Sequence, residues 1–93
     1  MSDNLVRLAD NIHYQELDGE MIVLNLNTER YLSLSESATL MLQTLLESDS
    51  TEQATKKLLQ IYDVDATTLT RDLHDFMDKL VQLGLITIGS NDT

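Results

Sequence analysis

Residues 12–34 read IHYQELDGEMIVLNLNTERYLSL, and this stretch decides the fold. Its centre, Asp18-Gly19, predicts a type I′ turn, because both central residues of that turn need a positive φ angle. Two segments flank the turn, Ile12–Leu17 before it and Glu20–Leu26 after it, and the second is apolar on both faces. A two-residue turn between two such segments predicts a β-hairpin.

A third strand is expected over Tyr31–Leu34, after a polar loop at Asn27–Arg30. Three short strands joined by tight turns make an antiparallel meander. If the loop pairs Leu26 with Tyr31, alternation along the strands sorts the side chains onto two faces. One face then carries Ile22, Leu24, Tyr31 and Ser33, and the other carries Met21, Val23, Leu32 and Leu34. The pattern leaves open which face meets the helices.

Three helices are expected to follow, because three residues stand where N-caps belong. Ser35, Ser50 and Asp65 each precede a segment with helical spacing of apolar residues. Ser50 is followed three residues later by Gln53, which makes a capping box. Gly84 stands at the C′ position after the third helix, where a left-handed conformation ends many helices.

Each predicted helix has one apolar stripe that should face the core. The stripes are Ala38, Leu42, Leu45 and Leu46; then Ala54, Leu58, Leu59 and Ile61; then Leu69, Leu73, Phe76, Leu80 and Leu83. A short closing strand is expected over Leu85–Ile88. The predicted fold class is α+β, a small winged-helix-like domain in which a three-stranded antiparallel meander precedes three helices. Residues 1–93 form one domain with an ordered core at about 5–88, and Met1–Asn4 and Gly89–Thr93 are expected to fray.

Charge narrows the classes of partner. Six Lys and Arg stand against sixteen Asp and Glu, a formal net charge of −10. Nucleic-acid binding depends largely on neutralising phosphates, so this balance argues against a nucleic-acid partner. It also disfavours adsorption to an anionic membrane. The partner that such a field attracts is a basic peptide or protein.

Composition also bears on compartment. The chain has no Cys, which excludes a disulfide framework and a thiolate zinc site. Residues 1–5 show neither the basic nor the apolar region of a signal peptide, and the longest apolar run, Met21–Leu24, is far too short for a membrane span. We therefore expect a cytoplasmic protein.

No motif for catalysis, a metal or a cofactor emerges. Asp63-Val64-Asp65 begins like a calcium loop, but Thr68 and His74 stand where that loop needs Gly and Glu. A turn followed by an N-cap explains these acids. His13 and His74 have no partner at ligand spacing. Asp49-Ser50 is similar to a carrier-protein attachment site, but capping already accounts for Ser50. We predict a protein that is not an enzyme, with no catalytic residue, metal or cofactor.

With no motif for catalysis, a metal or a cofactor, the function that remains is binding at the edge of a strand. The third strand has no Pro and a single charge, at Arg30, so its outer edge offers unpaired N–H and C=O groups. An extended peptide can add there as a further strand, which is β-augmentation. The third helix can form the far wall of such a groove. A solvated edge with no partner is the plainer interpretation.

Residues 17–38, LDGEMIVLNLNTERYLSLSESA, resemble the PqqD-like family. That family shows a D-G-E turn, an apolar strand, a T-G-R-Y-type turn and an L-N/S-E-x-A helix start. The second half agrees with the family at Leu58-Leu59, Tyr62-Asp63-Val64-Asp65, Asp72-Leu73, Phe76, Leu80 and Gly84-Leu85. The likeness spans about residues 10–88.

Two features differ from the family pattern. Glu29 stands where the second turn usually has Gly, which predicts a different loop conformation on the same fold. The chain also lacks a Pro-Glu-Gly segment and a Trp near its end. It therefore looks like a stand-alone member of the kind found beside lasso-peptide or radical-enzyme maturation systems, and less like a strict member of the pyrroloquinoline quinone (PQQ) pathway.

The resemblance implies a peptide chaperone. Such a protein binds the leader segment of a ribosomally made precursor peptide and presents it to a maturation enzyme, which is a radical SAM enzyme, a protease or a cyclase. The leader pairs antiparallel with the third strand and lies against the third helix. Carried onto this chain, the resemblance implies peptide-binding residues Arg30, Tyr31, Leu32, Ser33, Leu34, Leu69, Asp72, Phe76 and Lys79.

Two alternatives stay open. A docking subunit of an enzyme complex, without peptide specificity of its own, would use the same apolar edges. A winged-helix DNA-binding protein needs a basic recognition helix. Residues 66–83 instead carry Arg71 and Lys79 against Asp72, Asp75 and Asp78. An open edge also allows strand exchange, so a monomer or a strand-swapped dimer is expected.

Overall fold

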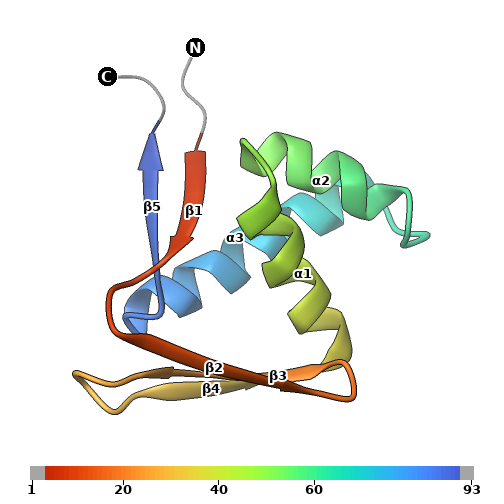
Figure 1. The fold of residues 1–93 in the computed structure, drawn as a ribbon. Coiled ribbons are helices and arrows are strands. Elements are labelled where there is room, and N and C mark those ends of the chain that lie inside the picture. Colours follow the sequence, from red (N-terminus) through yellow and green to blue (C-terminus); the bar gives the residue numbers. More distant parts are fainter. Residues whose placement is uncertain (1–3, 91–93) are drawn as a thin grey trace.

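The computed structural model describes residues 4–90, in which helices cover one face of a small sheet (Figure 1). No helix in this range is long and apolar enough to cross a bilayer. The elements in chain order are β1 (Asn4–Leu8), β2 (Ile12–Leu17), β3 (Glu20–Asn25), β4 (Tyr31–Leu34), α1 (Glu36–Glu47), α2 (Thr51–Leu59), α3 (Ala66–Gln82) and β5 (Ile86–Ser90).

The predicted meander is confirmed as an antiparallel sheet in the order β2-β3-β4. The register between β3 and β4 pairs Leu24 with Tyr31, and not Leu26 with Tyr31. This two-residue difference leaves the division into faces unchanged, because side chains alternate with a period of two. Met21, Val23 and Leu34 are buried, so their face meets the helices.

A second sheet, which the sequence reading missed, joins the two ends of the described chain. β1 pairs antiparallel with β5, with Val6 opposite Ile88, and Figure 1 shows this pair standing apart from the larger sheet. The prediction of a closing strand is thus confirmed. Asn4, Gly89 and Ser90, which are expected to fray, take part in this pairing, and their fraying stays a prediction. Residues 1–3 and 91–93 lie outside the described range.

The first turn has the predicted conformation, and the second contains a non-glycine residue with a positive φ angle. Asp18 and Gly19 have φ angles of 55° and 84°, as a type I′ turn requires. Glu29 has a φ of 62°, the left-handed region that favours glycine. Residue 29 thus adopts a backbone conformation suited to glycine at a steric cost. That this loop differs from the family's loop stays a prediction.

The three helices begin at the predicted caps. The Ser35 and Ser50 hydroxyls accept hydrogen bonds from the backbone N–H groups of Ala38 and Gln53, and the Asp65 carboxylate accepts one from Thr68. Gly84 follows α3 with a φ of 72°, as a C′ residue should.

The apolar stripes form a single core with the inner face of the sheet. Leu42, Leu58, Leu73 and Leu80 are fully buried in it. Two details differ from prediction. Ile61 lies beyond the end of α2 and is 59% exposed, whereas Met77 is buried because the α3 stripe is wider than the predicted seam.

We predict that Glu29→Gly stabilises the fold. Glycine adopts the left-handed region without strain, so the free energy of unfolding should rise by about 0.5–1 kcal/mol. Thermal unfolding should show Tm higher by about 3–6 °C. Glu20→Gly is the matched control, because it removes the same side chain from a strand position and should lower Tm. A lower Tm for Glu29→Gly would contradict the assigned loop conformation.

Candidate functional site

Strand β4 is an edge strand of the sheet and pairs only with β3 among the described residues 4–90. The backbone N–H of Asn25 donates to the carbonyl oxygen of Arg30 at 2.8 Å. In an antiparallel pair, every second residue bonds to the partner strand. Counting from Arg30, Leu32 and Leu34 direct their N–H and C=O groups to β3. The main-chain groups of Tyr31 and Ser33 therefore point away from β3.

The side chains of β4 alternate across the sheet in the predicted way. Leu34 is buried and Leu32 is half-buried, both on the helix side. Tyr31 is 63% exposed and Ser33 is exposed on the opposite face. Arg30 precedes the strand and is exposed, with its N–H donating to the Thr28 hydroxyl at 3.2 Å.

The four predicted residues of α3 do not all lie at the surface. Leu69 is only 6% exposed and belongs to the core, and Phe76 is half-buried against that core. Asp72 and Lys79 are exposed. α3 packs mainly against α2 and β5, while β4 packs mainly against β3 and α1. The two elements are thus joined through a common core, and Phe76 is the apolar member of this group that keeps partial access to solvent.

Asn25, which the sequence reading did not single out, links the start of β4 to the end of α3. Its side-chain amide donates to the carbonyl oxygen of Gly84 at 2.8 Å. Its side-chain oxygen accepts from the backbone N–H groups of Asn27 and Thr28, at 2.8 and 3.1 Å. The side chain is buried, so these bonds are shielded from water. An Asn placed directly before a polar loop is the sequence signal, because Asn caps turns in this way.

The described residues show no group of His, Cys, Asp or Glu arranged to hold a metal. His13 and His74 are exposed and lie on different elements, β2 and α3. The one ion pair within residues 4–90 joins Lys56 to Glu52 at 3.9 Å. Most acidic side chains of this range therefore stand without a paired cation, and the surface field is negative.

Comparison with known proteins gives a family and two structural matches. The family model described as coenzyme PQQ synthesis protein D (PqqD) matches residues 20–86. The structure of TbiB1 in complex with the TbiA(beta) leader peptide is 28% identical, with a TM-score of 0.80, over 86% of this chain and 93% of that chain. A lasso peptide synthetase B1 complexed with the leader peptide is 27% identical, also with a TM-score of 0.80, over 88% and 96% of the two chains. No curated protein sequence matches significantly.

We predict that the amide protons of Tyr31 and Ser33 exchange with solvent much faster than those of Leu32 and Leu34. The first pair has no hydrogen-bond partner in the sheet, and the second pair is bonded to β3. Hydrogen exchange followed by NMR on the domain alone should show a difference of about tenfold or more. Equal protection at all four amides would mean that the edge of β4 is covered.

Proposed function

Because the chain belongs to the PqqD family, we propose that it binds the leader segment of a ribosomally made precursor peptide and presents it to a maturation enzyme. Two similar structures support this proposal, since both contain a leader peptide bound to a chain that matches this one over most of its length. The observation that carries the proposal is the open edge of β4.

The leader binds as a fourth strand beside β4. Its main chain bonds to the outward N–H and C=O groups of Tyr31 and Ser33, which fixes the register without selecting a sequence. Side chains of the added strand alternate between two faces. Those on the helix side lie beside Leu32 and face α3, whereas those on the other side lie beside Tyr31.

Sequence preference comes from the helix side. Phe76 supplies a half-buried apolar surface, and Asp72 and Lys79 supply one charge of each sign on α3. Leu69 and Leu34 act indirectly, because their buried side chains support the wall and the strand. The net charge of −10 favours a leader, or a docking face on the enzyme, that carries Lys or Arg.

We assign the chemistry of maturation to the partner enzyme and a binding role to this domain. The partner is a radical SAM enzyme, a protease or a cyclase. The complex forms in the cytoplasm, where ribosomal precursors are made. A docking subunit without peptide specificity is the alternative, and it would hold a segment of the enzyme at β4 in place of the leader.

We predict that Ser33→Pro weakens leader binding by about tenfold or more. Proline removes the outward N–H of residue 33 and places its ring at the edge, while an edge strand tolerates it. Calorimetric titration with the leader of the precursor encoded beside this chain measures the change. Circular dichroism should show that the fold persists.

Glu16→Pro is the matched control, because it removes an outward N–H from β2, the other edge strand of the sheet. Leader affinity should be unchanged. Leader pairing at β4 would be contradicted if Ser33→Pro bound the leader as tightly as the wild type does. It would also be contradicted if Ser33→Pro and Glu16→Pro lost leader affinity equally. A wild type that binds the neighbouring enzyme but no leader would favour the docking subunit.

A further inference from the structure

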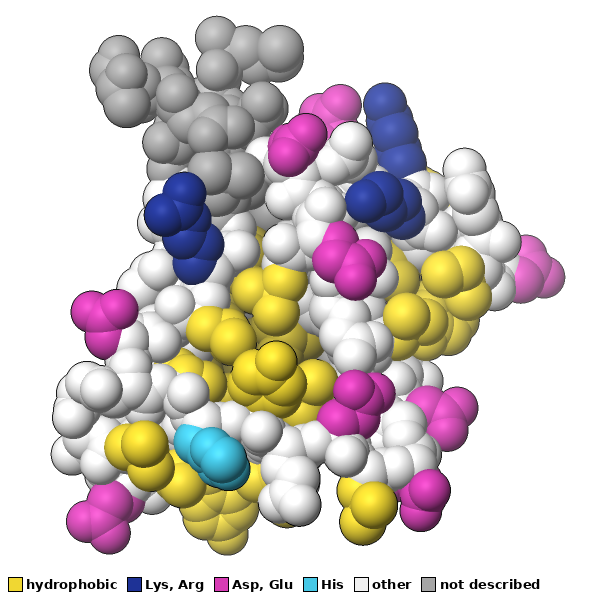
Figure 2. Space-filling view, in the orientation of Figure 1, with side chains coloured by type: hydrophobic (Ala, Val, Ile, Leu, Met, Phe, Trp, Pro, Cys, Tyr) yellow, Lys and Arg dark blue, Asp and Glu magenta, His cyan; other side chains and the backbone are white. Residues whose placement is uncertain are grey.

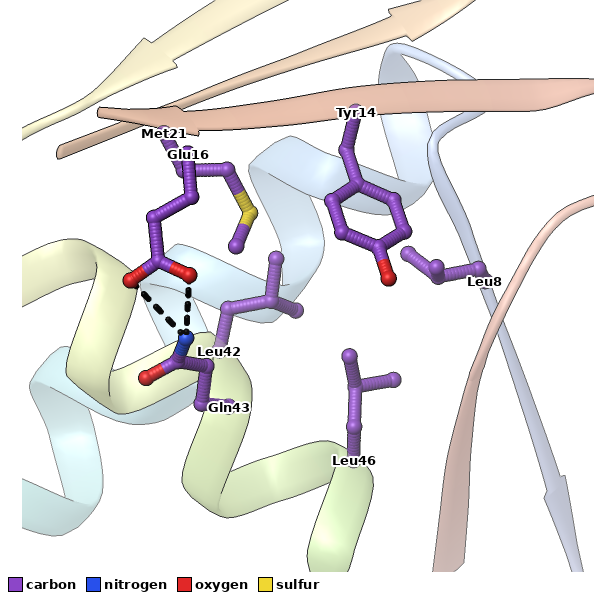
Figure 3. Close-up of a pocket in the computed structure, with 7 residues that line it drawn as sticks. All are labelled: Leu8, Tyr14, Glu16, Met21, Leu42, Gln43 and Leu46. Atoms are coloured by element: carbon purple, nitrogen blue, oxygen red, sulfur yellow. Dashed lines mark hydrogen bonds between the residues drawn. The ribbon is translucent and has the colours of Figure 1, made fainter. Parts of the chain in front are cut away.

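A cavity of about 170 Å³ opens between β2 and α1, on the side of the sheet that carries β2 and not β4 (Figure 3). Most of its lining is apolar, from Leu8, Met21, Leu42 and Leu46, and the side chains of Tyr14, Glu16 and Gln43 complete it. Figure 2 shows hydrophobic side chains gathered in this hollow between the sheet and α1. An apolar cavity of about 150 Å³ holds a benzene-sized ring, so this one has room for one aromatic or large aliphatic side chain.

The free edge of β2 runs along this cavity. Leu26 donates its backbone N–H to the carbonyl oxygen of Asn11 at 3.0 Å. Alternation from that bond directs the main-chain groups of Ile12, Tyr14 and Glu16 away from β3. The side chains of Tyr14 and Glu16 point down into the cavity from the same strand. Unpaired main-chain groups and a side-chain pocket thus lie together, as recognition of an extended segment requires.

The charge at the rim of this cavity indicates which side chains a segment bound along β2 should carry. The Glu16 carboxylate is exposed and accepts hydrogen bonds from the neutral side-chain amide of Gln43, at 3.3 and 3.4 Å. No cation in residues 4–90 forms an ion pair with it. Tyr14, whose ring stands over the cavity, is 53% exposed. A Lys or Arg next to an apolar side chain would complement this arrangement.

We propose that the free edge of β2 holds an extended, basic segment of the maturation enzyme, an inference that rests on the proposed function. One apolar side chain of that segment fills the cavity between Tyr14 and Leu46, and a neighbouring Lys or Arg pairs with Glu16. The leader at β4 and the enzyme at β2 then extend the same sheet from opposite edges. A second copy of this chain fits poorly, because each copy carries a net charge of −10.

The test measures enzyme binding and leader binding separately. The probes are the purified maturation enzyme encoded beside this chain and the synthetic leader of its precursor. Glu16→Lys should weaken enzyme binding by about tenfold or more, because it places a cation against the basic segment. Glu16→Pro should also weaken it, by removing the outward N–H. Glu52→Lys, on the exposed surface of α2, makes the same change in net charge among residues that do not line the cavity and should have little effect on enzyme binding.

Each outcome separates this inference from the proposed function. Loss of enzyme affinity in both Glu16 variants, with leader affinity kept, supports the second edge. Full enzyme affinity in both variants overturns it and leaves leader binding standing. Equal losses in Glu16→Lys and Glu52→Lys also overturn it, because the effect would then be one of net charge. If sedimentation shows that the wild type is a dimer and that Glu16→Pro is a monomer, the edge of β2 binds a second copy of this chain and the proposal is overturned. If the wild-type chain does not bind the leader at all, the proposed function is refuted instead.

Discussion

The buried side chain of Asn25 holds together the two elements on which the candidate site depends. It bonds to Gly84 after α3 and to the loop that precedes β4, so the end of the helix and the start of the edge strand keep a fixed relation. Neither element makes its main contacts with the other. Without this link, the strand edge and the half-buried Phe76 would be joined only through the core.

Hydrogen bonding along β3 explains why both edge strands of the sheet, β2 and β4, keep main-chain groups without a partner strand in the described residues. The bonds of Leu26 to Asn11 and of Asn25 to Arg30 show that successive residues of the central chain serve opposite neighbours. β3 is thereby saturated, and β2 and β4 each keep one row of free groups within the described residues. The two edges differ in what lies beneath them. β2 borders an apolar cavity with Glu16 at its rim, whereas β4 packs mainly against β3 and α1.

Local signals in the sequence predicted much of this architecture. Asp18-Gly19, the three N-caps and Gly84 act within a few residues, so their outcome follows from backbone chemistry alone. The pairing of β1 with β5 joins residues 78 to 86 positions apart, and no local pattern encodes such a contact. The burial of Leu69 and the cavity under Tyr14 depend on how helices pack on the sheet, which periodicity does not specify. Glu29 shows the converse, since tertiary context imposed a conformation that its own preference opposes.

Pairing of the leader with β4 is tested most directly by hydrogen exchange at both edges of the sheet in one sample. With saturating leader, the amides of Tyr31 and Ser33 should become protected, because they gain hydrogen-bond partners. The amides of Tyr14 and Glu16 on β2 should continue to exchange rapidly. Protection that develops on β2 while Tyr31 and Ser33 stay unprotected would contradict the assignment of the leader to β4.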